Sequence, residues 1–123
     1  MKKIYLASPY SHPDIGIKIG RFRRIAEIQA DLMRKNPKDL FFSPIVASHP
    51  VALYGKLEGS WDYWKRIDLE FINFCSEVWV VMLDGWKESK GVQEEIRYAL
   101  DSGMTVRFYQ ADLDTFIEYD EYE

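Results

Sequence analysis

The chain has few of the residues that hold small domains together covalently or through metal ions. Its 123 residues include one cysteine, Cys75, which excludes an internal disulfide and a cysteine-based zinc site. The two histidines, His12 and His49, stand beside prolines in expected loops and have no nearby group of carboxylates, which is a poor signal for metal binding. We therefore expect a fold that rests on its hydrophobic core and has no metal centre.

The sequence also lacks long hydrophobic runs and an excess of positive charge. The first apolar run, residues 4–7, is too short for a signal peptide or a membrane span, so we expect a cytoplasmic protein with no membrane partner. The formal net charge of -4 argues against a nucleic acid polymer as the main partner. Small anionic ligands remain possible, because local cationic groups decide their binding.

The apolar content is high enough for one folded domain. Hydrophobic residues make up 47% of the chain, so we expect a single domain over residues 1–123. Expected strands cover residues 4–7, 40–43, 78–83 and 104–109, and expected helices cover residues 17–35, 61–75 and 89–101. Residues 44–59 look irregular, and the acidic tail, residues 112–123, could form a helix, a strand, a solvated end or an oligomer contact. The alternation predicts an α/β fold built from parallel βαβ units.

The stretch over residues 78–103 carries the strongest functional signal. A β-branched and aromatic run leads through a loop into an amphipathic helix, and Ser89 and Gly91 stand where the loop meets the helix. Open parallel sheets bind their ligands at this place, beyond the carboxyl ends of the strands. We therefore expect a ligand site around the start of this helix.

Two carboxylates, Glu94 and Glu95, fall in the first turn of the same helix, where the helix dipole stabilises negative charge. Glu95 borders the apolar face of the helix, whereas Glu94 is expected to turn toward solvent. A carboxylate held over a crevice is a candidate nucleophile. The alternative is that both residues only stabilise the helix.

A third carboxylate, Asp68, lies inside an apolar stripe. It follows Trp64 by four residues and precedes Ile72 by four, so the three share one helix face. An ionised carboxylate there must find a partner, shift its pKa or line a site. Asp68 either caps a loop or pairs with an arginine, or it lines a crevice. Two carboxylates about 5 Å apart would suit retaining glycosidic chemistry.

The loop after the first expected strand is a candidate anion site. Ser8, Ser11 and the loop amides precede a helix that carries several arginines, Arg21 among them, and this combination suits a phosphate. The alternative is a solvated basic face. Three tryptophans could sandwich a planar base, although aromatic residues at helical spacing are more often core; they are Trp61, Trp64 and Trp86.

Three motifs together resemble the nucleoside 2-deoxyribosyltransferase superfamily, which includes deoxynucleoside 5'-monophosphate N-glycosidases. They are Ile4-Tyr5-Leu6-Ala7, Asp68-Leu69, and Ser89-x-Gly91-Val92-x-x-Glu95-Ile96-x-x-Ala99. The resemblance covers most of the chain in element order, and its motifs concentrate in the last third. Several short segments of the sequence are also similar to a small bacterial and phage branch of that superfamily. The fold it implies is a flavodoxin-like three-layer αβα sandwich around a parallel sheet of four to five strands.

The resemblance also implies roles for single residues. Glu95 matches the nucleophile that attacks C1' of the sugar, Asp68 the aspartate that helps to protonate the leaving base, and Tyr5 the tyrosine that hydrogen-bonds the nucleophile. Ser89 matches a serine that contacts a 5'-phosphate in the monophosphate hydrolases, but the segment after the first strand lacks their glycine-rich phosphate loop. The expected substrate-binding residues are Ser89, Gly91, Ser8, Tyr10, Arg21 and Trp64.

The expected activity is cleavage of the N-glycosidic bond of a nucleoside or nucleoside 5'-monophosphate, by hydrolysis or by transfer to another base. The resemblance implies that no cofactor is needed and that the chain forms a homodimer or a higher homo-oligomer. Two alternatives stay open. One is a nucleotide-binding sensor module that has lost turnover, and the other is a flavodoxin-like electron carrier.

Overall fold

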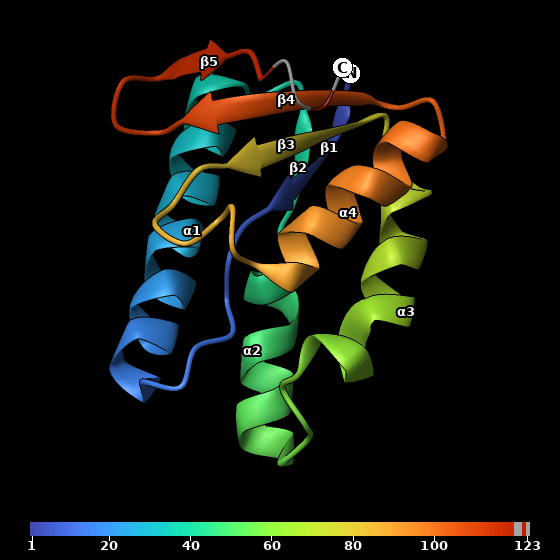
Figure 1. Cartoon of the computed structure of the whole chain (residues 1–123). Helices are drawn as coiled ribbons and strands as arrows, with labels where there is room; N and C mark the ends of the chain where they lie inside the picture. Colours follow the sequence, from blue (N-terminus) through green and yellow to red (C-terminus); the bar gives the residue numbers. More distant parts are fainter. Residues whose placement is uncertain (120–121, 123) are drawn as a thin grey trace.

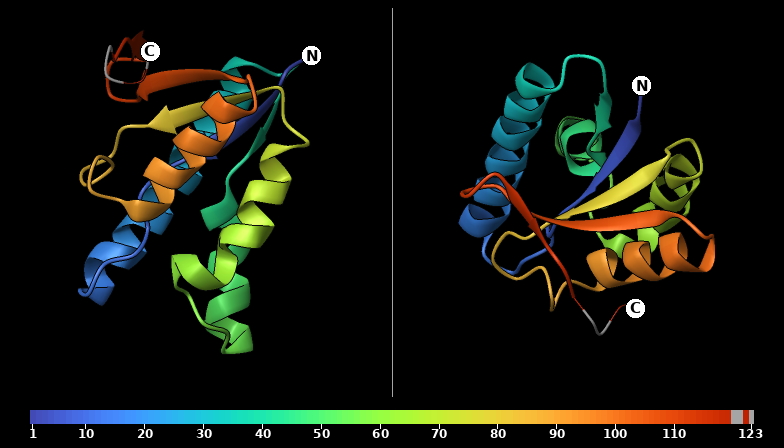
Figure 2. Two further views of the ribbon diagram at one scale, coloured as in Figure 1. Left: turned by 45° about the vertical axis from the view of Figure 1, so that its right-hand side comes forward. Right: turned by 90° about the horizontal axis from the view of Figure 1, so that it is seen from above.

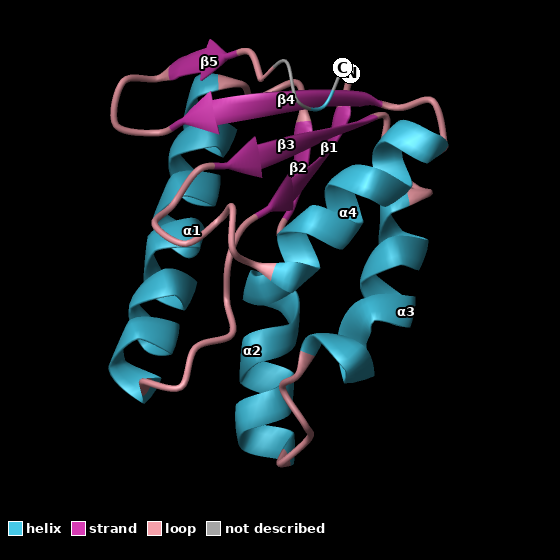
Figure 3. Ribbon diagram, in the orientation of Figure 1, coloured by secondary structure: helices cyan, strands magenta, loops and turns pink. Residues whose placement is uncertain are grey.

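The computed structural model describes residues 1–119 and 122, and in that part the chain folds into five strands and four helices (Figures 1 and 3). In chain order they are β1 (Lys3–Ala7), α1 (Ile15–Lys35), β2 (Leu40–Phe42), α2 (Pro44–Gly55), α3 (Trp61–Ile72), β3 (Glu77–Val81), α4 (Lys90–Asp101), β4 (Thr105–Gln110) and β5 (Thr115–Ile117). The expected α/β alternation is confirmed. Within these described residues, no helix is both long and apolar enough to cross a bilayer.

The strands form one mostly parallel sheet in the order β2-β1-β3-β4-β5. The first four strands are parallel, as expected, and β1 lies between β2 and β3. The fifth strand is antiparallel to β4, because a short turn with Asp114 in the left-handed region returns the chain directly. Part of the acidic tail therefore forms an edge strand, and residues 120, 121 and 123 of that tail lie outside the described residues.

The sheet is covered by helices on both faces, which is consistent with a three-layer arrangement (Figure 2). Alternation along β1 sends Ile4 into a cluster with residues of α1, and Tyr5 into a cluster with residues of α3 and α4. All five residues of β3 are buried, as its continuous apolar run predicts. This packing fixes the side-chain directions at the carboxyl ends of β1 and β3.

The expectation of an irregular stretch over residues 44–59 was wrong, because α2 occupies most of it. Ser43 caps this helix by accepting the amide hydrogen of Val46 at 3.2 Å, and Pro44 stands at the first turn, where a missing N–H does no harm. Pro50 lies inside the helix, and α2 contains no charged residue. The helix was not predicted because its segment contains two prolines and has no polar stripe. His49 consequently lies on a helix rather than in a loop.

The other helices depart from expectation only at their ends. Asp14 caps α1 by accepting the amide hydrogens of Gly16 and Ile17, so α1 begins two residues before the predicted start. Helix α3 ends at Ile72, three residues earlier than predicted. Gly103 has a φ of 74° just after α4, a left-handed conformation that glycine adopts readily and that ends the helix.

Candidate active site

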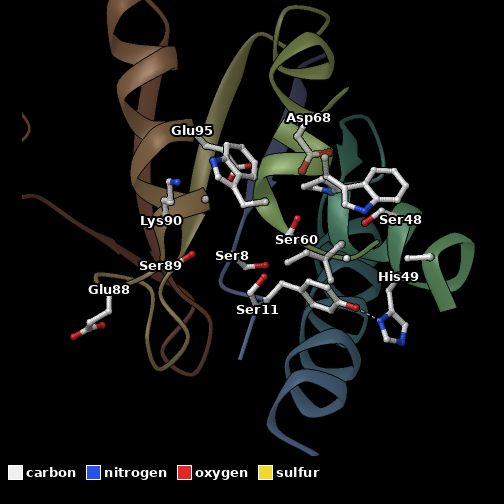
Figure 4. Close-up of a pocket in the computed structure, with 18 residues that line it drawn as sticks. Ser8, Ser11, Ser48, His49, Ser60, Asp68, Glu88, Ser89, Lys90 and Glu95 are labelled. Carbon is white, nitrogen blue, oxygen red and sulfur yellow. Dashed lines mark hydrogen bonds between the residues drawn. The ribbon is translucent and has the colours of Figure 1, made fainter. Parts of the chain in front are cut away.

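A pocket lies beyond the carboxyl ends of β1 and β3, where the strand order reverses direction (Figure 4). Ligands of open α/β sheets bind at such a switch point. It is lined by the loop after β1, by α2, by α3 and the loop before it, and by the start of α4 with the loop before that helix. Polar and charged residues in its wall are Ser8, Tyr10, Ser11, Ser48, His49, Ser60, Asp68, Glu88, Ser89, Lys90 and Glu95. Segments distant in sequence thus meet in one polar pocket.

The carboxylate of Glu95 is the most deeply buried charged group in this wall. Its residue is 3% exposed, deeper than the sequence pattern indicated. Burial raises the pKa of Glu95 well above its ordinary value, the hydrogen bond from the Tyr5 hydroxyl lowers it, and the negative charge of Asp68 raises it again. Tyr5 therefore selectively stabilises the ionised form of a group that its surroundings disfavour.

Tyr5 lies in β1, behind Glu95, and its side chain is completely buried. Its hydroxyl donates a hydrogen bond to Oε2 of Glu95. Burial raises the pKa of Tyr5 well above 10, and the charge of Glu95 raises it further, so the hydroxyl keeps its proton and remains a donor. The contact joins β1 to α4 across 90 positions of sequence.

Asp68 reaches the same pocket from α3. Burial raises the pKa of Asp68 to about 7. Among the hydrogen bonds and ion pairs of the described residues, none involves the Asp68 side chain, so it neither caps a loop nor pairs with an arginine there. A half-protonated carboxyl group near neutral pH can donate and accept protons.

Two serines of the pocket wall, Ser8 after β1 and Ser89 at the start of α4, form what we call the polar corner. The Ser8 hydroxyl is buried and has no hydrogen-bond partner within the described residues. Ser89 caps α4 by accepting the amide hydrogen of Val92 at 3.2 Å, which leaves its own hydroxyl hydrogen free to donate. A buried unpaired hydroxyl and a helix amino terminus in one pocket are groups suited to an anion.

Glu94 is more exposed than Glu95 and does not line the pocket, as expected, but it has a partner on another helix. Glu94 is half-buried, and its carboxylate accepts a hydrogen bond from the indole N–H of Trp61. Trp61 lines the pocket together with Gly91 and Glu95. The contact with Trp61 was not predicted, because helical periodicity places Glu94 relative to its own helix only, whereas the start of α3 lies against this position.

Seven of the nine predicted site residues line the pocket, namely Glu95, Asp68, Ser89, Gly91, Ser8, Tyr10 and Trp64. Tyr5 acts behind it through Glu95. Arg21 is not brought to this pocket: its guanidinium donates to the backbone carbonyls of Ser11 and Asp84, which ties two loops together. Trp86 is a core residue that packs against Phe108, so it cannot sandwich a base.

Tyr10 was predicted as a site residue, but its contact with His49 in the pocket wall was not. The Tyr10 hydroxyl bonds to Nδ1 of His49, and the imidazole stacks on Phe22 with ring centroids 4.1 Å apart. Burial lowers the pKa of His49, and the positive charge of Lys18 lowers it further. Recognising α2 from its Ser43-Pro44 start would have placed His49 on a helix, on the face that meets Phe22 of α1.

Within the part of the chain that the structure describes, no three His, Cys, Asp or Glu side chains are grouped closely enough to hold a metal ion. The chemistry that the pocket itself offers is that of a coupled pair of carboxyl groups, with a tyrosine donor behind one of them and a polar corner nearby.

The structure is an α/β protein with a carboxylate-lined pocket at the switch point of its sheet. Residues 2–111 match a domain family described as "Domain of unknown function (DUF1937)", and the chain belongs to that family. No curated protein matches the chain. The matched region includes every pocket residue and ends just before β5.

Proposed function

We propose that the chain cleaves the N-glycosidic bond of a nucleoside 5'-monophosphate or nucleoside through a covalent glycosyl ester on Glu95. One observation carries the proposal: Glu95 is buried at the pocket with the Tyr5 hydroxyl on its carboxylate, while Asp68 faces the same pocket with a pKa of about 7. The resemblance of the sequence motifs to nucleoside 2-deoxyribosyltransferases supports the same assignment of roles.

In the first step, an oxygen of Glu95 would bond to C1' of the sugar while the bond from C1' to the base nitrogen breaks. The electron pair of that bond goes to the base, and Asp68 gives the base its proton. In the second step, water attacks C1', the ester bond to Glu95 breaks, and Asp68 takes the proton from water. If a second base attacks instead of water, the outcome is transfer, and the same residues serve both reactions.

These two reaction steps require that one of the two carboxyl groups is protonated and the other ionised. Asp68 must begin protonated and Glu95 ionised, and burial alone disfavours charge on both. The Tyr5 hydrogen bond lowers the pKa of Glu95 and so favours the required distribution. Positive charge that develops on the sugar would stabilise the Glu95 carboxylate further.

The polar corner favours a substrate that carries a 5'-phosphate. The unpaired Ser8 hydroxyl, the free hydrogen of Ser89 and the amides at the start of α4 are all donors for an anion. These groups line the same pocket as Glu95, so a sugar over Glu95 could present its phosphate to them.

We expect a nucleoside 5'-monophosphate to be cleaved with a higher kcat/KM than the matching nucleoside. Ser89→Asp should erase or reverse this preference, because its negative charge repels phosphate, and Ser89→Ala should weaken it by about 1.5–3 kcal/mol. Base release from a panel of nucleosides and monophosphates, with and without an acceptor base, measures this by chromatography. Ser102→Asp is the matched control, since it adds the same charge at the exposed far end of α4. An unchanged preference in Ser89→Asp would remove the phosphate role, and absence of base release throughout would favour a binding module.

The strand order also suggests a flavodoxin-like arrangement as the finer description of the fold. The order 2-1-3-4-5 is the one found in that group, although β5 is antiparallel here and two helices separate β2 from β3. An enzyme with this proposed reaction would meet its substrates in the cytoplasm.

We also propose that the chain forms a homodimer or higher homo-oligomer through α2. This helix has no charged residue, and it exposes Val51, Leu53 and Tyr54, whose exposed fractions are 51%, 56% and 83%. Sedimentation equilibrium is expected to give at least twice the monomer mass of 14.5 kDa, and Tyr54→Glu is expected to weaken the association. A monomer at all concentrations would contradict this proposal without affecting the one for Glu95.

A further inference from the structure

The indole of Trp61 packs against the first turn of α4. A Cβ placed on Gly91 would come 3.2 Å from Cε3 and 3.4 Å from Cδ2 of this indole, so the ring packs directly on the Gly91 backbone. The indole N–H reaches the Glu94 carboxylate, three residues further along the helix. Gly91 therefore admits the ring and Glu94 holds its polar edge.

The position of this ring relative to Glu95 follows from helix geometry. Gly91 is adjacent on the helix surface to both Glu94 and Glu95, which follow it by three and four positions. An indole that packs on Gly91 therefore borders the pocket wall that Gly91 and Glu95 share, and Trp61 lines the same pocket. An ion pair between Lys90 and Asp62, 3.3 Å long, ties the starts of the same two helices together.

We propose that Glu94 is a positioning residue for the pocket: it fixes the indole of Trp61 as the wall that orients a ligand over Glu95. The inference rests on the proposed function in so far as Glu95 is the reacting group. Glu94 itself need not touch the ligand, since its effect passes through Trp61. A hydrogen bond from an N–H to a carboxylate is about twice as strong as one between neutral groups, which suits a fixed wall.

The contact has a consequence for catalysis that a merely structural contact would lack. A ring held in one orientation presents a constant apolar surface next to the nucleophile, keeps water from part of it and limits the poses of the sugar. Without its acceptor, the indole can rotate about its side-chain bonds, and a small misplacement of the reacting atoms lowers the rate strongly. A variant that lacks the Glu94 carboxylate should therefore have a lower kcat/KM even at temperatures where it is fully folded.

A double-mutant cycle on kcat/KM tests the pair. Glu94→Ala and Trp61→Phe should each lower kcat/KM by about 10- to 100-fold, and the double variant should lose no more than the worse single variant. Glu94→Gln keeps an acceptor oxygen and should recover most of the activity. Glu70→Ala, an exposed glutamate of α3, is the matched control and should match the wild type. Losses that add in the double variant, or equal losses in Glu94→Ala and Glu94→Gln, would overturn the inference.

The indole N–H signals in a ¹H–¹⁵N spectrum provide a readout that does not need turnover. The chain has four tryptophans, so Trp61→Phe identifies the Trp61 signal by its absence. Glu94→Ala should move that signal, and addition of a nucleoside 5'-monophosphate should move it in the wild type. A wild type that releases base while Glu94→Ala keeps full kcat/KM would overturn this inference and leave the proposed reaction standing. If the nucleotide shifts the Trp61 signal of the wild type but no base is released, the proposed reaction is contradicted and the role of Trp61 in orienting a ligand is retained.

Discussion

Glu95→Ala is expected to lower base release by at least about 10³-fold while the chain remains folded. The covalent route disappears with the carboxylate, because neither Asp68 nor Tyr5 can replace it as a nucleophile at C1'. The fold should survive, since the substitution removes a buried carboxyl group that the surroundings disfavour in its charged form. Chromatography of released base, together with circular dichroism of the variant, provides the measurement.

Trapping with a 2-fluoro nucleoside or its monophosphate checks the same assignment directly. Mass spectrometry should find the label on a peptide that contains Glu95 and should find none in Glu95→Ala. Glu94 is not a neutral comparison, because it holds Trp61. Its variants should keep a labelled Glu95 and lose only part of the rate. A label on Glu94, or equal loss of all base release in both alanine variants, would show that the wrong carboxylate was chosen.

Asp68→Asn is expected to lower kcat/KM by about 10²–10⁴-fold for poor leaving bases and by much less for activated ones. The asparagine keeps the shape of the side chain and removes the proton that the leaving base needs. In the wild type, kcat/KM for poor leaving bases should fall as the pH rises above about 7, because Asp68 then loses that proton. A uniform loss across leaving groups with an unchanged pH profile would indicate that Asp68 only positions the substrate.

The same substitution should stabilise the folded chain at neutral and alkaline pH. Burial raises the pKa of Asp68 from 3.8 to about 7, so the folded state holds this proton more tightly than the unfolded state. Below 3.8 both states are protonated and Asp68 has no effect on stability. As the pH rises toward 7 the unfolded state loses its proton first, and the free energy of unfolding decreases until both states are ionised. Asparagine avoids this loss, and chemical denaturation should show a gain of about 1–3 kcal/mol above pH 7 that vanishes in acid.

The layout of the sheet could be predicted from sequence because its signals are local. The buried run of β3, the Ser89 cap of α4 and the glycine after α4 each follow from residues close together in the chain. The Asp14 cap of α1 and the Ser43-Pro44 start of α2 are equally local but were not recognised, and α2 also lacks the charged stripe that marks an amphipathic helix. The antiparallel β5, by contrast, depends on pairing with β4.

The candidate site was predictable to the extent that motifs point at single residues. Asp68 was identified from its place inside an apolar stripe, and Glu95 from its place in the first turn of α4. The periodicity of one helix does not show which residues of another helix pack against it. The hydrogen bond between Trp61 of α3 and Glu94 of α4 could therefore not be predicted from sequence. Arg21 was expected to bind an anion, but it donates hydrogen bonds to the backbone carbonyls of two loops. The conformation of those loops determines these contacts, and helical periodicity does not predict it.

The wall of the pocket comes from the first loop, from α2, from α3 and from α4, so no single helix or loop contains it. A complete pocket therefore requires that these segments are packed together on the sheet. The binding free energy of a ligand then adds to the stability of the entire molecule, about 2.7 kcal/mol at a hundredfold excess over Kd. Ligand binding would consequently increase the protection of backbone amides from hydrogen exchange along β1 and β3 as well as at the pocket. The extent of this increase would show how cooperatively the domain unfolds.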